Sequence, residues 1–327
     1  MQKKTRDWTH ELVELLNSPV KAKQNGVISF PIGKNDSILH VCKLWEGVFV
    51  WANDIYESCL SNNANFEHDE GRVYINICLD GRCEVNMPTG EYIYMSPGIL
   101  CVAGSFTGNG EEWEHNYPTN LYKGIEISID LKQLRLSEGI ELSSYGITSD
   151  WLKKYIKRDS SDFGMQLAGA KLLKIAENLY KDLLDNDKTL FDYRYQVLSM
   201  LYEIKNEEAI RPHSIMLVSK GQRRIANEVA KELTADLTKH ITIEQLSQKY
   251  NISQSSLKKY FEMVYGKTIS FYQKEKRMEK AGKLIIEKKK SIGEIASECG
   301  YENQSKFSSA FKAYTGSTPI EYRRLNV

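Results

Sequence analysis

The chain has 327 residues, of which 41% are hydrophobic and 27% are charged. This composition is typical of a soluble globular protein, and the length suits two domains better than one. Its apolar stretches fall far short of the roughly 18 residues that cross a bilayer, and the N-terminus lacks a signal-peptide pattern. We therefore predict a cytoplasmic protein with no membrane partner.

The formal net charge of +1 conceals an uneven distribution. Residues 220–327 carry 21 Lys and Arg against 12 Asp and Glu, a balance of +9, which leaves the preceding residues with −8. Such an asymmetry indicates that the basic part meets a polyanion, although chance clustering of surface charges gives the same pattern.

Residues 27–130 contain short runs rich in Val, Ile, Tyr and Cys, separated by Gly, Asn, Asp and Pro. RVYINICL (72–79) and EYIYM (91–95) are examples. Short strands with turn residues every 8–12 positions are typical of an antiparallel barrel or sandwich.

The six cysteines form no C-x-x-C pair, and five of them fall in this strand-rich region. Free and mostly buried thiols are the simplest interpretation in a cytosolic chain. The histidines of the region, His40, His68 and His115, are far apart and form no H-x-H pair, so we predict no metal site.

The pattern becomes helical after residue 145. Leu172, Ala176, Leu179 and Leu183 recur on one helical face, and a second helical run follows at 192–206. We predict a helical hairpin at about 163–206, which either closes the open end of the barrel or forms a dimer interface; both roles can hold together. Residues 207–221 lack periodicity and are interpreted as a linker.

An internal repeat marks the last third, relating residues 241–272 to residues 291–322. Apolar positions match at an offset of 49 before a turn and 50 after it: Ile243 with Ile292, Leu246 with Ile295, Leu257 with Phe307, and Phe261 with Phe311. Each copy has the pattern of a scaffold helix, a short turn and a second helix. We predict helix-turn-helix units at 241–266 and 291–316.

A helix at 268–287 joins the two units. About 20 helical residues span roughly 30 Å, and B-DNA turns once in about 34–36 Å. The linking helix therefore suits two recognition helices that enter successive major grooves of double-stranded DNA.

The second helix of each unit leaves polar residues outside its apolar face. Gln pairs with adenine, Lys with guanine and Ser with either base, so these residues suit base reading, although a solvated polar face has the same composition. The DNA-binding candidates are Gln254, Ser255, Ser256, Lys258 and Lys259 in the first unit, and Gln304, Ser305, Lys306 and Ser309 in the second.

The segment from about Arg223 to Arg324 resembles the DNA-binding domain of the AraC/XylS regulators. ITIEQLSQKYNISQSSLKKYF, RMEKAGKLI and IGEIASECGYENQSKFSSAFKAYTGSTPIEYRR carry the resemblance. It implies a seven-helix domain with one reading helix per unit, and an activator that contacts RNA polymerase. Ser309 stands where many relatives carry Arg, which implies a weaker or water-mediated contact there.

The stretch GRCEV…GEYIYMSPG resembles the cupin-type effector and dimerisation domains of the same family. The resemblance implies a homodimer and a small-molecule effector in the barrel. The candidates for lining its cavity are Trp45, Trp51, Arg82, Tyr92, Tyr94 and Trp113. Plain core packing is the alternative for the aromatic residues.

These patterns together predict an α+β multidomain protein. Residues 1–206 form a cupin-like antiparallel β-barrel with its helical hairpin, 207–221 the linker, and 222–327 an all-α tandem helix-turn-helix domain. The predicted function is sequence-specific transcription regulation under a small-molecule effector. A regulator that needs no ligand is the alternative. A cupin enzyme with a DNA-binding tail is a third hypothesis. The sequence contains neither clustered metal ligands nor a nucleophile motif, so we predict neither enzymatic activity nor a cofactor.

Overall fold

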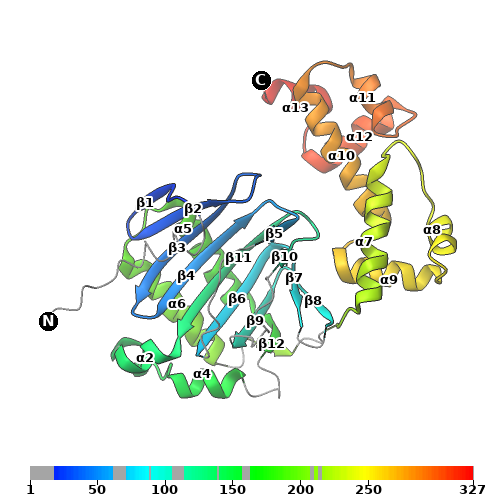
Figure 1. Ribbon diagram of the computed structural model, residues 1–327. Helices are drawn as coiled ribbons and strands as arrows, with labels where there is room; N and C mark the ends of the chain where they lie inside the picture. The colour runs from blue at the N-terminus through cyan, green and yellow to red at the C-terminus, as the bar shows by residue number, and fades with distance from the viewer. Residues whose placement is uncertain are drawn as a thin grey trace. The chain divides into compact units, whose positions relative to one another are not determined.

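The computed structural model describes residues 18–61, 71–87, 90–104, 114–137, 140–156, 163–206, 210–212 and 216–326. The chain divides into two compact units (Figure 1). The first extends to Leu217, and the second begins at Val218 and also takes in Gly90–Tyr92.

The first unit is built on two antiparallel sheets. The larger sheet has the order β1-β2-β3-β4-β11-β6-β9-β12-β13 and the smaller one β5-β10-β7-β8. Their bounds are β1 (Ala22–Gln24), β2 (Val27–Ile32), β3 (Ser37–Trp45), β4 (Val48–Ile55), β5 (Cys59–Ser61), β6 (Arg72–Gly81), β7 (Cys83–Asn86), β8 (Tyr92–Met95), β9 (Ile99–Gly104), β10 (Glu114–Asn116), β11 (Tyr122–Asp130), β12 (Phe163–Ala168) and β13 (Ile210–Pro212). The α+β class and the antiparallel strands are confirmed. The described strands form two sheets, and hydrogen bonds among them do not close a ring.

The larger sheet is covered on one face by the helical hairpin of α5 (Ala170–Asp185) and α6 (Leu190–Lys205) (Figure 1). Because successive side chains alternate between the faces of a strand, Ile125, Ile127 and Ile129 of β11 all pack toward these helices. Glu126 and Ser128 between them point to the opposite face. Part of that face packs against the smaller sheet, where Ile93 of β8 meets Ile55 and Ile99 of the larger one.

The hairpin begins later than the predicted residue 163. Residues Phe163–Ala168 form strand β12, which pairs with β9 through contacts such as Met165 with Cys101. The exposed edge of β9 offers backbone partners that outweigh the local helical preference. The helices begin after Gly169, and α6 opens on a capping box between Thr189 and Asp192. Three shorter helices precede β12: α2 (Leu131–Ser137), α3 (Ile140–Ser144) and α4 (Ser149–Ile156).

The second unit is helical throughout its long described segment, residues 218–326, apart from the turns between helices. They are α7 (Lys220–Ala235), α8 (Ile243–Lys249), α9 (Gln254–Tyr265), α10 (Ile269–Glu287), α11 (Ile292–Glu298), α12 (Gln304–Thr315) and α13 (Pro319–Leu325). Each begins after a Ser, Thr or Asn whose side chain accepts a hydrogen bond from a backbone N–H of the first turn, which defines its start. Across the described parts of the chain, none of the helices is both long and apolar enough to span a membrane.

Candidate DNA-binding surface

The first helix-turn-helix pair, α8 and α9, is held by an aromatic cluster. Phe261 is fully buried; its ring stacks on Tyr265 at 4.6 Å and meets Tyr272 of α10 edge-on at 5.3 Å. The Tyr265 hydroxyl donates to Asn227 Oδ1 of α7 at 3.1 Å. Since α9 is fixed against both α7 and α10, its opposite face is available for binding.

The second pair, α11 and α12, repeats this arrangement with different residues. Phe307 and Phe311 are fully buried, and Phe311 meets Tyr322 of α13 edge-on at 5.3 Å. Cys299 completes the core, and burial raises the pKa of its thiol to about 11. The thiol therefore stays protonated and acts as a packing group.

The turns within the two pairs use different residues for the same backbone conformation. Asn251 has φ 51° in the first turn and Gly300 has φ 75° in the second. A Cβ atom at Gly300 would lie 2.6 Å from the Leu237 carbonyl oxygen, so only glycine fits there. Ser253 and Asn303 cap the helices that follow these turns, α9 and α12.

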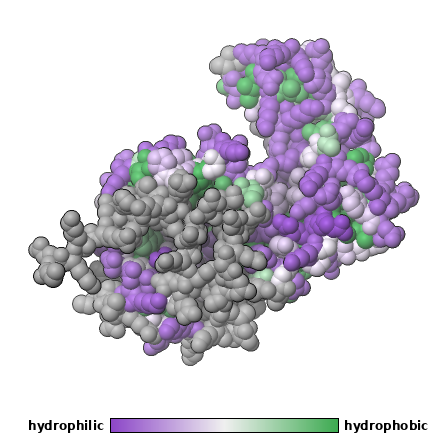
Figure 2. Space-filling view, viewed as in Figure 1, coloured by the Kyte–Doolittle hydropathy of each residue, from purple (hydrophilic) through white to green (hydrophobic). Residues whose placement is uncertain are grey.

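The residues predicted to bind DNA lie on the first two turns of α9 and α12. Most are exposed: Gln254, Ser255, Lys258, Lys259, Gln304, Ser305, Lys306 and Ser309. Ser256 is partly buried. Figure 2 shows hydrophilic residues over most of the visible surface of the helical second unit. Both recognition helices thus present a polar N-terminal half outside an aromatic core.

Three lysines on these surfaces are electrostatically uncompensated. Among the described residues, Lys258, Lys259 and Lys306 make no ion pair, whereas several other lysines of the unit do. The pairs include Lys249 with Glu232 at 2.7 Å, Lys267 with Glu275 at 2.6 Å, and Lys290 with Glu298 at 2.6 Å. The ammonium groups of these three lysines are therefore available to contact phosphates or bases.

The two helices differ in how their first turns use polar atoms. In α9, the Ser253 hydroxyl lies 2.9 Å from the Ser255 hydroxyl and also 2.9 Å from that of Ser256. In α12, Asn303 Oδ1 accepts the backbone N–H groups of Ser305 and Lys306 at 2.8 and 3.1 Å. This cap leaves the Ser305 and Lys306 side chains free of hydrogen bonds within the described chain.

One residue of this surface escaped prediction. This residue is Gly293 of α11. A Cβ atom at this position would lie 3.2 Å from Gln304 Oε1, so the absence of a side chain leaves room for the Gln304 amide. Glu244 holds the matching place in the first unit. The sequence could have revealed this position, because the second scaffold helix has a glycine where the first has a glutamate.

The effector candidates do not form one cluster. Trp51 of β4 lies on the sheet face opposite the hairpin, whereas Trp45 packs on the hairpin side with the Arg194 guanidinium 5.4 Å from its ring. Arg82 and Tyr94 come together, with the guanidinium 5.5 Å from the ring centroid. Tyr92 groups with the second unit, and Trp113 lies outside the described residues.

Sequence reasoning missed a carboxylate beside Trp51. In the sheet register, Glu126 stands between Trp51 of β4 and Asn76 of β6. The alternating pattern of GIEISID could have revealed it, because Glu126 must lie on the sheet face opposite the isoleucines.

Comparison with known proteins supports the C-terminal assignment. A family of helix-turn-helix domains matches residues 246–325. The chain is 27% identical over 262 residues to YisR, an uncharacterized HTH-type transcriptional regulator of Bacillus subtilis (strain 168), and the match covers 78% of this chain and 83% of YisR. It is 39% identical over 88 residues to the xylose operon regulatory protein of Escherichia coli (strain K12), covering 27% of this chain and 22% of that protein. Among solved structures, the C-terminal domain of AraT, a response regulator from Geobacillus stearothermophilus, is 29% identical, with a TM-score of 0.30 over 31% of this chain and 84% of that one.

Proposed function

The chain belongs to the AraC/XylS family of DNA-binding transcription regulators, and we propose that α9 and α12 each read one major groove of double-stranded DNA. One observation carries the proposal: α9 and α12 have equivalent apolar cores, and each presents a polar face with lysines that form no ion pair with described residues. In this proposal the N-terminal domain, predicted at residues 1–206, controls DNA binding in response to a small-molecule effector, and the bound regulator acts on RNA polymerase.

The length of α10 supports the use of two grooves. Its 19 residues correspond to roughly 28 Å of helix, close to the rise of about 34–36 Å per turn of B-DNA. Figure 1 shows α10 running between the two helix-turn-helix pairs, so it sets their spacing.

Selection from a random duplex library with the purified full-length protein tests this function. Two short boxes about one helical turn apart are the expected result. A single box would mean that one unit grips only the backbone. No enrichment at moderate salt, with or without metabolite extract, would overturn the proposal.

A regulator without a ligand is the second candidate for the N-terminal unit. The two are separated by thermal melting of the full chain with candidate metabolites, since a ligand that binds only the folded state raises the melting temperature. Glu126 and Ser128, which share a sheet face with Trp51, are polar residues that a ligand can contact, and they favour the effector-responsive form.

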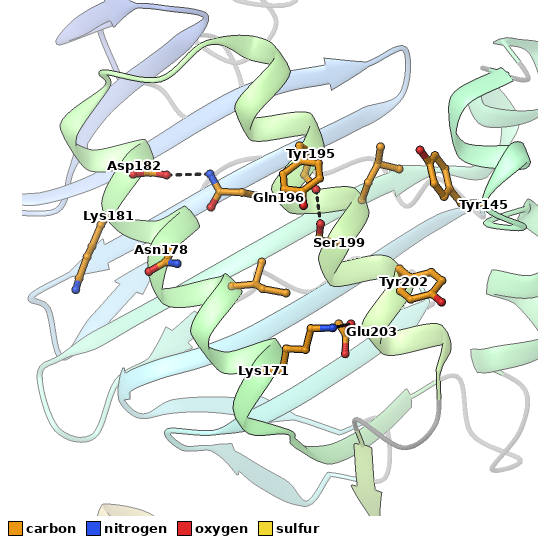
Figure 3. A pocket seen from close by; sticks show the side chains of 12 residues that line it. Tyr145, Lys171, Asn178, Lys181, Asp182, Tyr195, Gln196, Ser199, Tyr202 and Glu203 are labelled. Carbon is orange, nitrogen blue, oxygen red and sulfur yellow. Dashed lines mark hydrogen bonds and ion pairs between the residues drawn. The ribbon is translucent and has the colours of Figure 1, made fainter.

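The proposal includes a homodimer formed through the outward face of the helical hairpin. A shallow groove of about 770 Å³ runs between α5 and α6, and Figure 3 shows Tyr195, Tyr202 and Tyr145 lining it. Phe191, Tyr195 and Tyr202 are 75%, 65% and 50% exposed, which is unusual for aromatic residues of one helix. A second copy of the chain would cover them.

Sedimentation velocity tests the dimer. Tyr195→Glu should weaken self-association by roughly tenfold or more, about 1.4 kcal/mol, because it puts a charge into an apolar contact. Leu325→Glu, which replaces an exposed apolar residue of α13, is the matched control. Equal association of both variants and the wild type would exclude this face.

A further inference from the structure

Glu126 is a carboxylate inside the first unit for which the described structure shows no cationic partner. The hydrogen bond that it accepts comes from Asn76 Nδ2, which lies 3.2 Å from Glu126 Oε2. Among the described residues, no Lys, Arg or His pairs with it. Burying a carboxylate without a counter-charge is unfavourable, so such a group is commonly neutralised, paired or used to bind a ligand.

The groups around Glu126 do not supply that charge. Within the described part of the chain, the titratable side chains that interact with it are all acids: Cys83 of β7, Cys101 of β9, Tyr117 in the turn before β11, and Tyr122 of β11. Burial raises the pKa of each of them, so all four are neutral near pH 7. Burial likewise raises the pKa of Glu126 itself to about 7.

Aromatic rings flank the carboxylate. Trp51 is its direct cross-strand neighbour on β4, and the Trp51 indole N–H donates to Ser128 Oγ at 3.2 Å, which fixes the ring. In the next row of the same face, Ser128 stands between Phe49 and Tyr74. Glu126, Trp51 and Tyr74 all remain partly exposed within the described structure. A carboxylate beside aromatic faces is the combination that binds organic cations.

We propose that this face of β4, β11 and β6 binds a small organic cation, a ligand with a protonated amino group, through Glu126 and Trp51. This inference rests on the proposed effector response of the N-terminal unit and names the chemical class of the effector. Glu126 supplies the counter-charge, Asn76 orients the carboxylate, and Trp51 covers the apolar part of the ligand.

The test is thermal melting of the full-length protein with propylamine, benzylamine and phenethylamine, each compared with its alcohol counterpart. At least one amine should raise the melting temperature in a concentration-dependent way that its neutral alcohol does not reproduce. The amine effect should grow from pH 6 to pH 8, because the carboxylate ionises in this range while the amines stay protonated. If no amine exceeds its alcohol, the inference is wrong.

Variants identify the site. Glu126→Gln keeps the shape of the side chain and should weaken amine binding at least tenfold and remove its pH dependence. Trp51→Phe should weaken binding to a smaller extent. Glu46→Gln, which alters an exposed glutamate of the same unit, should bind amines like the wild type. Amine binding that persists in Glu126→Gln would place the cation elsewhere and overturn the assignment.

DNA selection with the same preparations separates the two proposals. Enriched DNA boxes without any amine effect would remove only the cation site. An amine effect without DNA enrichment would leave the cation site standing and remove the proposed DNA reading.

Discussion

The two helix-turn-helix pairs share one apolar framework but present different polar atoms. In the first pair, the Ser253 hydroxyl hydrogen-bonds to the hydroxyls of Ser255 and Ser256, so all three are partly occupied in the absence of DNA. In the second, Asn303 caps α12 through backbone groups alone, and the Ser305 and Lys306 side chains make no hydrogen bond to the described residues. From this comparison we expect the second pair to discriminate bases more strongly, and the first to contribute mainly through Lys258 and Lys259.

The scaffold helices also differ in how they begin. Thr242 forms a capping box with Gln245 at the start of α8, and Ser291 forms one with Glu294 at the start of α11. The geometry is shared, but one box is neutral and the other carries a carboxylate. We therefore expect the start of α11 to respond to acid and the start of α8 not to.

The largest effect is expected from a core deletion in one pair. Phe311→Ala removes a fully buried ring that contacts Phe307 and Tyr322, and it should cost about 3–5 kcal/mol of stability through the resulting cavity. Because the first pair has its own aromatic cluster, hydrogen exchange should accelerate in α11 and α12 more than in α8 and α9.

Tyr314→Ala is the control for this deletion, since Tyr314 lies on the same helix with 43% of its surface exposed. It should cost well under half as much in chemical denaturation. If Phe311→Ala loses no more stability than the control, the core assignment is wrong. Equal acceleration of exchange in both pairs would show that they unfold as one body.

A smaller effect is expected from the reading surface of the second pair. Lys306→Ala should cost roughly 1–3 kcal/mol on the preferred DNA site and relax base preference at particular positions. Ser255→Ala in the first pair should change base preference less than Ser305→Ala, because the Ser255 hydroxyl already has a partner in Ser253.

Binding of the selected site and its single-base variants measures both changes. Lys283→Ala, an exposed lysine of α10, serves as the charge-matched control. Uniform weakening of all sequences by Lys306→Ala would make Lys306 a phosphate contact. A larger loss of preference in Ser255→Ala than in Ser305→Ala would reverse the proposed ranking of the two pairs.

We expect Lys258→Ala to change mainly the salt dependence of DNA binding. If Lys258 meets a phosphate, its removal should lower the slope of log K against log salt concentration by about 0.9, with little change in base preference. Titrations of one duplex across a range of salt concentrations give this slope. An unchanged slope with altered base preference would move Lys258 from backbone contact to base reading.

Local signals account for what the sequence predicted well. The repeat identified Leu257, Phe261, Phe307 and Phe311 as core residues, and all four are fully buried. Helix spacing and capping residues act over a few positions, so they can be recognised without knowledge of the rest of the fold.

The misplaced features depend on distant parts of the chain. Strand β12 exists because β9, some sixty residues earlier, offers it an open edge, and no local pattern announces that pairing. Trp45 was assigned to the barrel interior from its residue type. A register shift between Lys43 and Trp45, in the pairing of β3 with β4, accompanies its packing on the hairpin side. Strand alternation alone does not reveal such a shift.

The smallest expected effect concerns acid and the start of α11. Hydrogen bonds from the Ser291 backbone N–H and hydroxyl lower the pKa of Glu294 below the ordinary value of a glutamate. A carboxylate with a lowered pKa in the folded state stabilises the protein above the unfolded pKa, and this contribution is lost as pH falls through the folded value. Below about pH 4.5, amide exchange at the start of α11 should therefore accelerate more than at the start of α8, where Gln245 does not titrate. Glu294→Gln should make the two helices respond alike. If α11 and α8 already respond alike in the wild type, the carboxylate does not distinguish the two capping boxes.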